Sequence, residues 1–222
     1  MRNLVFRYFI FVLGLYFLSL GVVLIVLSSL GTTPISSVNY VLSLNTPLTL
    51  GTATFIINML LIIGQFWLIR GVGGKKDVFE ILLQIPFSLI FSFFIDFNMA
   101  VLSGIHLSSY YLCIGVLLIG CLSQAVGVVL ELKPNVAIMS AEGFVKYASR
   151  RYNKDFGKLK VKFDISLVTM AALISLAFSG HIDGIREGTL VAALSTGYIV
   201  SFLSRYVITR KHFDRLTSIV RA

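Results

Sequence analysis

Long uncharged apolar runs alternate with short polar segments along the whole chain. Between Tyr8 and Ile69 no residue is charged. About 20 apolar residues cross the hydrocarbon core of a bilayer, and backbone groups in lipid must be satisfied within their own segment. The runs therefore predict six transmembrane helices. The predicted spans cover residues 8–29, 51–69, 79–102, 109–130, 161–180 and 188–209.

Two of the polar breaks predict a short helix of their own. In "SSLGTTPISSVNYVLSLNTPLTLG", Gly31 ends a helix, Thr33 caps the next and Pro34 suits its first position, which predicts a helix over 34–44. The break "KPNVAIMSAEGFVKYASRRYNKDFG" predicts a second short helix over 136–151. The first is too apolar for water. We therefore expect it either to dip into the membrane or to pack over the bundle, and we expect the second to do the same from the opposite face.

Composition supports a membrane location. Of the 222 residues, 57% are hydrophobic and 13% are charged, whereas a soluble domain carries about 25% charged residues. The net charge of +9 indicates how the chain is oriented in the membrane. Every Lys and Arg except Arg186 falls in the N-terminus, in segments 70–78 and 131–162, or in the C-terminus. The positive-inside rule places these regions, and both termini, in the cytoplasm. Nucleic acid is not an expected partner.

A weak internal repeat runs through the chain. The tetrapeptide GVVL occurs at 21–24 and at 127–130, and a shift of 106 residues also superimposes the span boundaries without a gap. Three spans per copy would make the second copy enter the membrane from the opposite side, as in the inverted repeats of secondary transporters. The predicted fold is an all-α integral membrane protein with repeats 1–106 and 107–222. The alternative is two similar but unrelated apolar runs.

The shift by 106 residues also selects candidate binding residues. It pairs Ser36 with Glu142 and Asn58 with Asp164, so the second copy has carboxylates where the first has neutral polar groups. A charge inside a span is costly and rarely faces lipid. Glu142 and Asp164 would therefore bind a cation, relay protons or balance a basic substrate. The alternative for Asp164 is an interfacial position paired with one of the lysines that shortly precede it.

The remaining candidates lie in the breaks and at the start of the sixth span. Thr33 and Ser140 belong to the two breaks, where short helices would direct free N–H groups at an anion. Arg186 and Glu187 either begin the sixth span as solvated charges or serve in binding. Arg186, the only base on the predicted outer side, would bind an anionic group or pair with Glu187 or Asp183.

Several segments resemble a known family. "MSAEGFVKYAS", "FGKLKVKFDISLV" and "REGTLVAAL" resemble the bacterial YczE/YyaS/YitT membrane proteins, particularly the YczE-like branch, and "LGTTPISSVNYVLS" resembles the other half of that family. Relatives commonly show Gly-x-x-Pro-x-Asp at the break. Here Ser36 and Glu142 stand at the acidic place, and Ser140 replaces the Pro in the second copy. The resemblance implies a bacterial inner-membrane protein of a family usually labelled as transporters.

These patterns predict a secondary transporter or exporter of a small solute, coupled to protons or cations, in which one repeat rocks against the other. The alternative is a non-transporting membrane partner that docks through the basic segment 146–162. No metal-ligand spacing, nucleotide loop or nucleophile elbow is visible, so neither an enzyme nor a cofactor is expected. The expected partners are the lipid bilayer, a small-molecule or ion substrate and a second copy in a homodimer.

Overall fold

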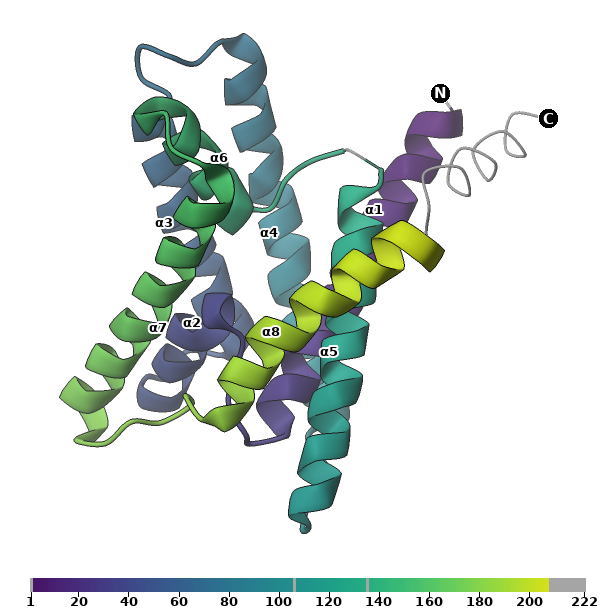
Figure 1. Cartoon of the computed structure of the whole chain (residues 1–222), viewed down its shortest axis with the longest axis vertical. Coiled ribbons are helices and arrows are strands. Elements are labelled where there is room, and N and C mark those ends of the chain that lie inside the picture. The colour runs from purple at the N-terminus through teal and green to yellow at the C-terminus, as the bar shows by residue number, and fades with distance from the viewer. Residues whose placement is uncertain (1, 106, 135, 208–222) are drawn as a thin grey trace.

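The computed structural model describes residues 2–105, 107–134 and 136–207, and within these ranges all regular structure is helical (Figure 1). The helices are α1 (Arg2–Leu27), α2 (Pro34–Asn45), α3 (Leu50–Leu68), α4 (Lys75–Leu102), α5 (Tyr110–Leu132), α6 (Ser140–Tyr152), α7 (Phe156–Ser179) and α8 (Glu187–Phe202), followed by a π-helix over Leu203–Val207. The basic residues from Arg210 onward, which the topology prediction uses, lie outside the described residues.

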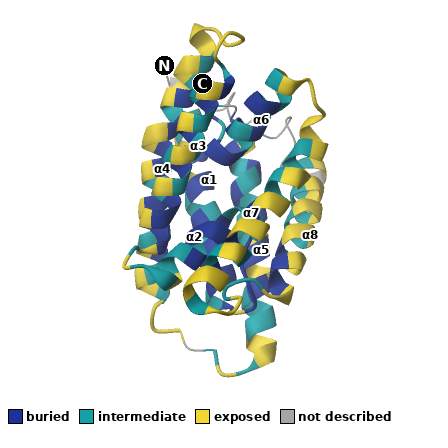
Figure 2. Cartoon of the chain, turned by 90° about the vertical axis from the view of Figure 1, so that its left-hand side faces the viewer, coloured by how far each residue is buried: buried dark blue, intermediate teal, exposed yellow. Residues whose placement is uncertain are grey.

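The surface of the helical bundle is apolar. The helices α1, α3, α4, α5 and α7 are each long and apolar enough to cross a membrane. Large side chains such as Ile63, Phe93 and Leu173 are 63%, 64% and 64% exposed, and Figure 2 shows exposed positions along the outer faces of the bundle. Water would penalise so much contiguous apolar surface, whereas lipid does not. The chain is therefore a multi-pass membrane protein.

The sixth predicted span, 188–209, is only partly helical in the α form. α8 ends at Phe202 after 16 residues, which is shorter than the roughly 20 that a bilayer core requires. The π-helix continues the turn to Val207, and positions 208 and 209 lie outside the described residues. Six spans therefore remain a prediction, and five helices meet the requirement within the described ranges.

The first short helix begins where the sequence predicts it. Thr33 is extended, and its hydroxyl accepts a hydrogen bond from the Ser36 N–H, while Pro34 occupies the first turn of α2. The predicted start of the second short helix at 136 is wrong, because α6 begins at Ser140. Ala137 and Met139 are buried in the core formed with α1 and α4. This packing holds the segment before Ser140 in a non-helical path.

The two long helices α1 and α5 cross at glycines. A Cβ atom at Gly21 would lie 2.5 Å from the backbone nitrogen of Gln124, and one at Gly127 would lie 2.4 Å from that of Leu18. Gly21 and Gly127 are the glycines of the two GVVL segments. Small residues allow helix backbones to approach closely in a membrane. The repeated motif thus marks the contact between these helices.

Each short helix packs against a long helix from the other half of the chain. α2 contacts α7 through a cluster of Val38, Val41, Leu167 and Ala171. α6 contacts α3, with Tyr147 and Ala148 in a cluster with Ile62 and Leu68. In Figure 1, α6 lies toward the upper end of the bundle and α2 toward the lower end. The N-terminal turns of both helices border the interior cavity described next.

Candidate functional site

A cavity of about 120 Å³ lies between the first turns of α2 and α6. Its walls also come from α1, α3, α4 and α5, so both halves of the chain contribute. Its polar lining comprises Thr33, Ser36, Asn39, Thr54, Asn58, Gln124, Glu131, Ser140 and Glu142, and its apolar lining includes Leu18, Val22, Phe91 and Val128. This is the candidate site, and we call it the central cavity.

Five of the eight residues selected from the sequence line the central cavity. They are Thr33, Ser36, Asn58, Ser140 and Glu142. Ser140 donates a hydrogen bond from Oγ to Asn58 Oδ1 at 2.6 Å, which ties α6 to α3. At the start of α2, the Thr33 hydroxyl donates to Ser36 Oγ at 3.0 Å. Of the four residues that the shift by 106 residues selects, Ser36, Asn58 and Glu142 line the central cavity and Asp164 does not.

The other three selected residues lie outside the central cavity. Asp164, Arg186 and Glu187 line a groove of about 640 Å³ between α7 and α8. Arg186 donates to the Ser29 carbonyl at 3.2 Å, and its guanidinium lies 3.5 Å from the Glu187 carboxylate. Both side chains are more than half exposed. The geometry favours the interpretation of Arg186 and Glu187 as exposed charges at a helix start.

Asp164 has a basic partner on its own helix. Lys160 Nζ lies 2.7 Å from Asp164 Oδ1, one helical turn away, and 4.0 Å from Glu142 Oε1. The alternative interpretation of Asp164, a carboxylate paired with a nearby lysine, matches this geometry. Lys160 is held mainly by Asp164, and Glu142 has a more distant counter-charge.

Glu131 is the acidic cavity residue that sequence reasoning missed. It belongs to the last turn of α5, is 5% exposed and lines the central cavity. Its carboxyl group lies near the Met139 N–H. The predicted span ended at residue 130, which assigned Glu131 to a polar loop. A span longer by one turn would have placed this carboxylate inside the membrane and marked it as functional.

Several polar atoms in the central cavity have no hydrogen-bond partner within the described chain. Asn39 donates from Nδ2 to Thr54 Oγ1, which leaves Oδ1 unpaired. Asn58 accepts from Ser140, which leaves Nδ2 unpaired, and Gln124 Oε1 is also unpaired. Asn39 and Asn58 are only 3% and 7% exposed. Buried polar atoms are normally satisfied, so these atoms indicate that the cavity holds something polar.

One of the two short-helix N-termini is capped, and the other begins beside carboxylates. Thr33 caps α2 through the Ser36 N–H, whereas Met139, the N-cap residue of α6, makes no side-chain cap and lies near the Glu131 carboxylate. Glu142 adds an acidic side chain to that first turn. An anion at α6 would therefore meet two carboxylates. This arrangement is unfavourable for the anion site that the sequence predicted at the two N-termini.

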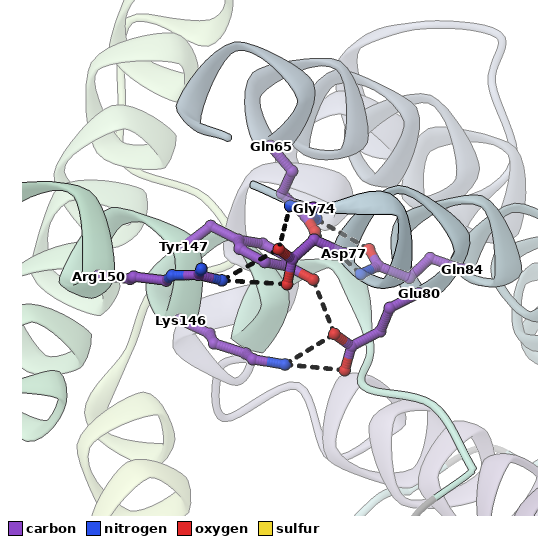
Figure 3. A network of polar contacts seen from close by, with 8 residues as sticks. All are labelled: Gln65, Gly74, Asp77, Glu80, Gln84, Lys146, Tyr147 and Arg150. Carbon is purple, nitrogen blue, oxygen red and sulfur yellow. Dashed lines mark hydrogen bonds and ion pairs between the residues drawn. The ribbon is translucent and has the colours of Figure 1, made fainter. Parts of the chain in front are cut away.

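A reciprocal pair of amides holds α6 from the side of α3 and α4 (Figure 3). Gln65 donates to Gln84 Oε1 at 2.8 Å, and Gln84 donates back to Gln65 Oε1 at 2.9 Å. Gln65 also donates to the Ser140 carbonyl at 3.0 Å. Both amides are fully buried, and a Cβ atom at Gly143 of α6 would lie 2.8 Å from each of them. The pair fixes the cavity end of α6.

A second set of contacts holds the middle and the far end of α6 against α4 (Figure 3). Glu80 accepts from Lys146 Nζ at 2.8 Å and from the Tyr147 hydroxyl at 2.7 Å. Asp77 accepts from Arg150 at 3.0 Å. Burial, with Glu80 beside it, raises the pKa of Tyr147 well above its usual range. Its hydroxyl therefore stays protonated and donates. We call these contacts the α4–α6 clamp.

Two open hollows lie near the lower end of the bundle in Figure 1. One, of about 790 Å³, is bordered by Asp96 and Ser103 of the α4 end, and the other, of about 530 Å³, by Asp183 and Arg186. Tyr40 borders both. Burial, and then the nearby Asp183 carboxylate, raise the pKa of Tyr40. This end is hollow, and the α4–α6 clamp lies at the opposite end.

Comparison with known proteins gives one family match. The model of a family of unknown function (DUF6198) matches residues 5–205, which include the central cavity and the α4–α6 clamp. No curated protein and no solved structure matches the chain. The family description assigns no activity, so the function must be argued from the residues themselves.

Proposed function

Because the chain belongs to a family of unknown function (DUF6198), we propose its function from its own residues: it is a secondary transporter that moves a small solute through the central cavity, coupled to protons or cations. The observation that carries this proposal is the set of unpaired, buried polar atoms between the starts of two short helices. Broken or short helices whose ends meet near the middle of the membrane are the usual binding sites of such transporters.

The helix boundaries support an inverted repeat of three spans and one short helix. α2 begins at 34 and α6 at 140, and α3 begins at 50 and α7 at 156, so both pairs differ by 106 residues. α2 packs on α7 as α6 packs on α3. The proposed repeats are residues 1–106 and 107–222. Kinship with the YczE-like branch, and a bacterial inner membrane with cytoplasmic termini, complete the proposal.

The two ends of the bundle support alternating access. The α4–α6 clamp joins two helices at the basic end, which is the cytoplasmic end by the positive-inside rule, and the hollows lie at the other end. We propose that this conformation faces outward. Release of the clamp would free α6 from α4, while its contacts with α3 and α7 would remain.

The alternative, a non-transporting partner docked through 146–162, has less support. Lys146 and Arg150 are engaged in the α4–α6 clamp, and Arg151 donates to the Leu68 and Arg70 carbonyls at 3.0 Å each. These three basic side chains therefore stabilise the packing of α6 within the chain. A homodimer and an absence of enzymatic activity stay predictions.

The test is a comparison of solutes inside and outside cells that lack the gene, carry it, or carry a variant. Transport predicts that one solute redistributes on deletion and that Glu142→Gln with Asn58→Leu fails to restore it at normal membrane expression. Asp164→Asn is the matched control, because that residue lies outside the central cavity. Full restoration by the cavity double variant would contradict the proposed site.

A further inference from the structure

The residues that line the central cavity favour one chemical class of ligand. We propose, resting on the transport function above, that the central cavity binds a small organic cation with N–H donors, such as an alkylammonium or guanidinium group, and that Glu131 is its principal counter-ion. The acidic lining, the unpaired polar atoms and the size of the cavity support this inference.

The titratable lining of the cavity is acidic. Glu131 and Glu142 both line it, and among the described lining residues none is Lys, Arg or His. Lys160 Nζ lies 4.0 Å from Glu142, but it is closer, at 2.7 Å, to Asp164. Two carboxyl groups thus line the cavity, whereas Lys160 has its own close partner. A cation in the cavity would stabilise the ionised form of these carboxyl groups.

The unpaired atoms favour a ligand that donates hydrogen bonds. Asn39 Oδ1 and Gln124 Oε1 are acceptors without a partner within the described chain. Together with the two carboxylates they offer oxygen atoms from α2, α5 and α6. Among the described cavity amides, Asn58 Nδ2 is the one fully buried nitrogen without a partner. Unpaired buried oxygens and carboxyl groups therefore outnumber unpaired buried donors, so a donor-rich cation fits better than an anion.

Size and wall chemistry favour a compact organic ion. A cavity of about 120 Å³ has room for roughly four water molecules, at about 30 Å³ each. The apolar part of the wall includes Phe91, whose ring face attracts cations. Leu18, Val22 and Val128 can cover the carbon atoms of the ligand. Apolar side chains would not stabilise a strongly hydrated inorganic ion.

Calorimetric titration of the purified chain in lipid nanodiscs tests this inference. Guanidinium chloride is the probe, and urea is the control of nearly the same shape without the charge, both at concentrations well below those that denature proteins. We expect saturable binding of guanidinium and no measurable binding of urea. Equal binding of both, or binding of neither by a folded protein, would overturn the inference.

Variants locate the binding to the central cavity. Glu131→Gln should weaken guanidinium binding about tenfold or more, because a hydrogen bond to a charged group is lost. Gln124→Leu keeps the volume and removes one free acceptor, and it should weaken binding about severalfold, so the test does not depend on one variant folding well. Glu187→Gln, an exposed carboxylate of the α7–α8 groove, should bind as the unaltered protein does. Unchanged affinity in both cavity variants would overturn the assignment.

Two further arms separate this inference from the transport function. Sodium that competes with guanidinium at equal concentration would overturn the preference for an organic cation. Reconstituted vesicles that move a neutral or anionic solute, with no guanidinium binding, would overturn the ligand class while transport stands. Saturable guanidinium binding with no flux of guanidinium or of any solute across the vesicles would keep the cation site and overturn the transport function.

Discussion

Buried amides and glycines decide much of the interior at the scale of single residues. Gln65 and Gln84 satisfy each other, while Asn39 and Asn58 of the central cavity are each left with an unpaired atom. The same residue chemistry is therefore used for structure at one place and is free for binding at the other. A buried amide whose partner is removed costs about 1–3 kcal/mol. This asymmetry allows the two uses to be separated by mutation.

The amide pair gives the first prediction. Gln65→Leu and Gln84→Leu should each lower the free energy of unfolding by about 1–3 kcal/mol, because each strands a buried amide. The double variant Gln65→Leu with Gln84→Leu should cost clearly less than the sum, since no stranded partner remains. Thermal unfolding in detergent measures this. Strictly additive losses would show that the two side chains act independently.

The glycine contact gives the second prediction, with a control on the same helix. Gly127→Ala should destabilise the protein by about 1–3 kcal/mol, because a Cβ atom there would lie 2.4 Å from the Leu18 backbone nitrogen. Gly115→Ala, where nothing lies within 4 Å of the new Cβ, should be neutral or stabilising by up to about 1 kcal/mol. The same melting assay applies. Equal effects at both positions would contradict the close crossing of α1 and α5.

Only some of the residues that line the central cavity could be predicted from the sequence. Ser36, Asn58 and Glu142 were found because the internal shift aligns polar positions that line one cavity. Glu131 was missed because the predicted span ended two residues before the end of α5, which moved Glu131 into a loop. Asn39 and Gln124 carry no motif, and their role depends on which atoms remain unpaired after folding. No sequence pattern contains that information.

α6 is the informative element, because it joins the cavity to the basic end of the bundle. Its first turn lines the central cavity, and its middle and far end are held by the α4–α6 clamp. The sequence predicted this short helix, but not its start. The buried Ala137 and Met139 keep the preceding segment non-helical, and that packing comes from distant α1 and α4 rather than from local propensity. α2 was predicted well because its cap is local.

The α4–α6 clamp gives the third prediction. Glu80→Ala should destabilise the protein by about 1–3 kcal/mol, mainly because the nearly buried Tyr147 hydroxyl loses its acceptor. Tyr147→Phe in that background should recover part of the loss. The exposed pair Asp77–Arg150 should contribute less than about 1 kcal/mol. Unfolding temperatures of the two variants measure the effect at Glu80, and no recovery by Tyr147→Phe would contradict the account.

The whole molecule has an apolar exterior, a polar interior cavity and a marked difference between its two ends. The membrane location followed directly from composition and span length. The arrangement of the helices did not, because crosswise packing of α2 on α7 and of α6 on α3 depends on contacts between distant segments. The repeat predicts the order of elements. It does not predict which faces meet.

Topology gives the fourth prediction. In a background with Cys113→Ala and Cys121→Ala, Lys76→Cys should react with a membrane-impermeant thiol reagent only in inside-out vesicles. Gly104→Cys should react only in right-side-out vesicles, because it lies at the opposite end of α4. Reaction of both positions from the same face would contradict the predicted orientation.

Alternating access to the central cavity is the central claim, and Ser140→Cys tests it most directly. Ser140 is 1% exposed and lines the central cavity at the start of α6. In the same cysteine-free background, a small membrane-impermeant cationic thiol reagent is applied to right-side-out and to inside-out vesicles, with Lys76→Cys reporting vesicle orientation. A transporter predicts reaction of Ser140→Cys from both faces. Reaction from one face only, or from neither, would contradict transport through this cavity.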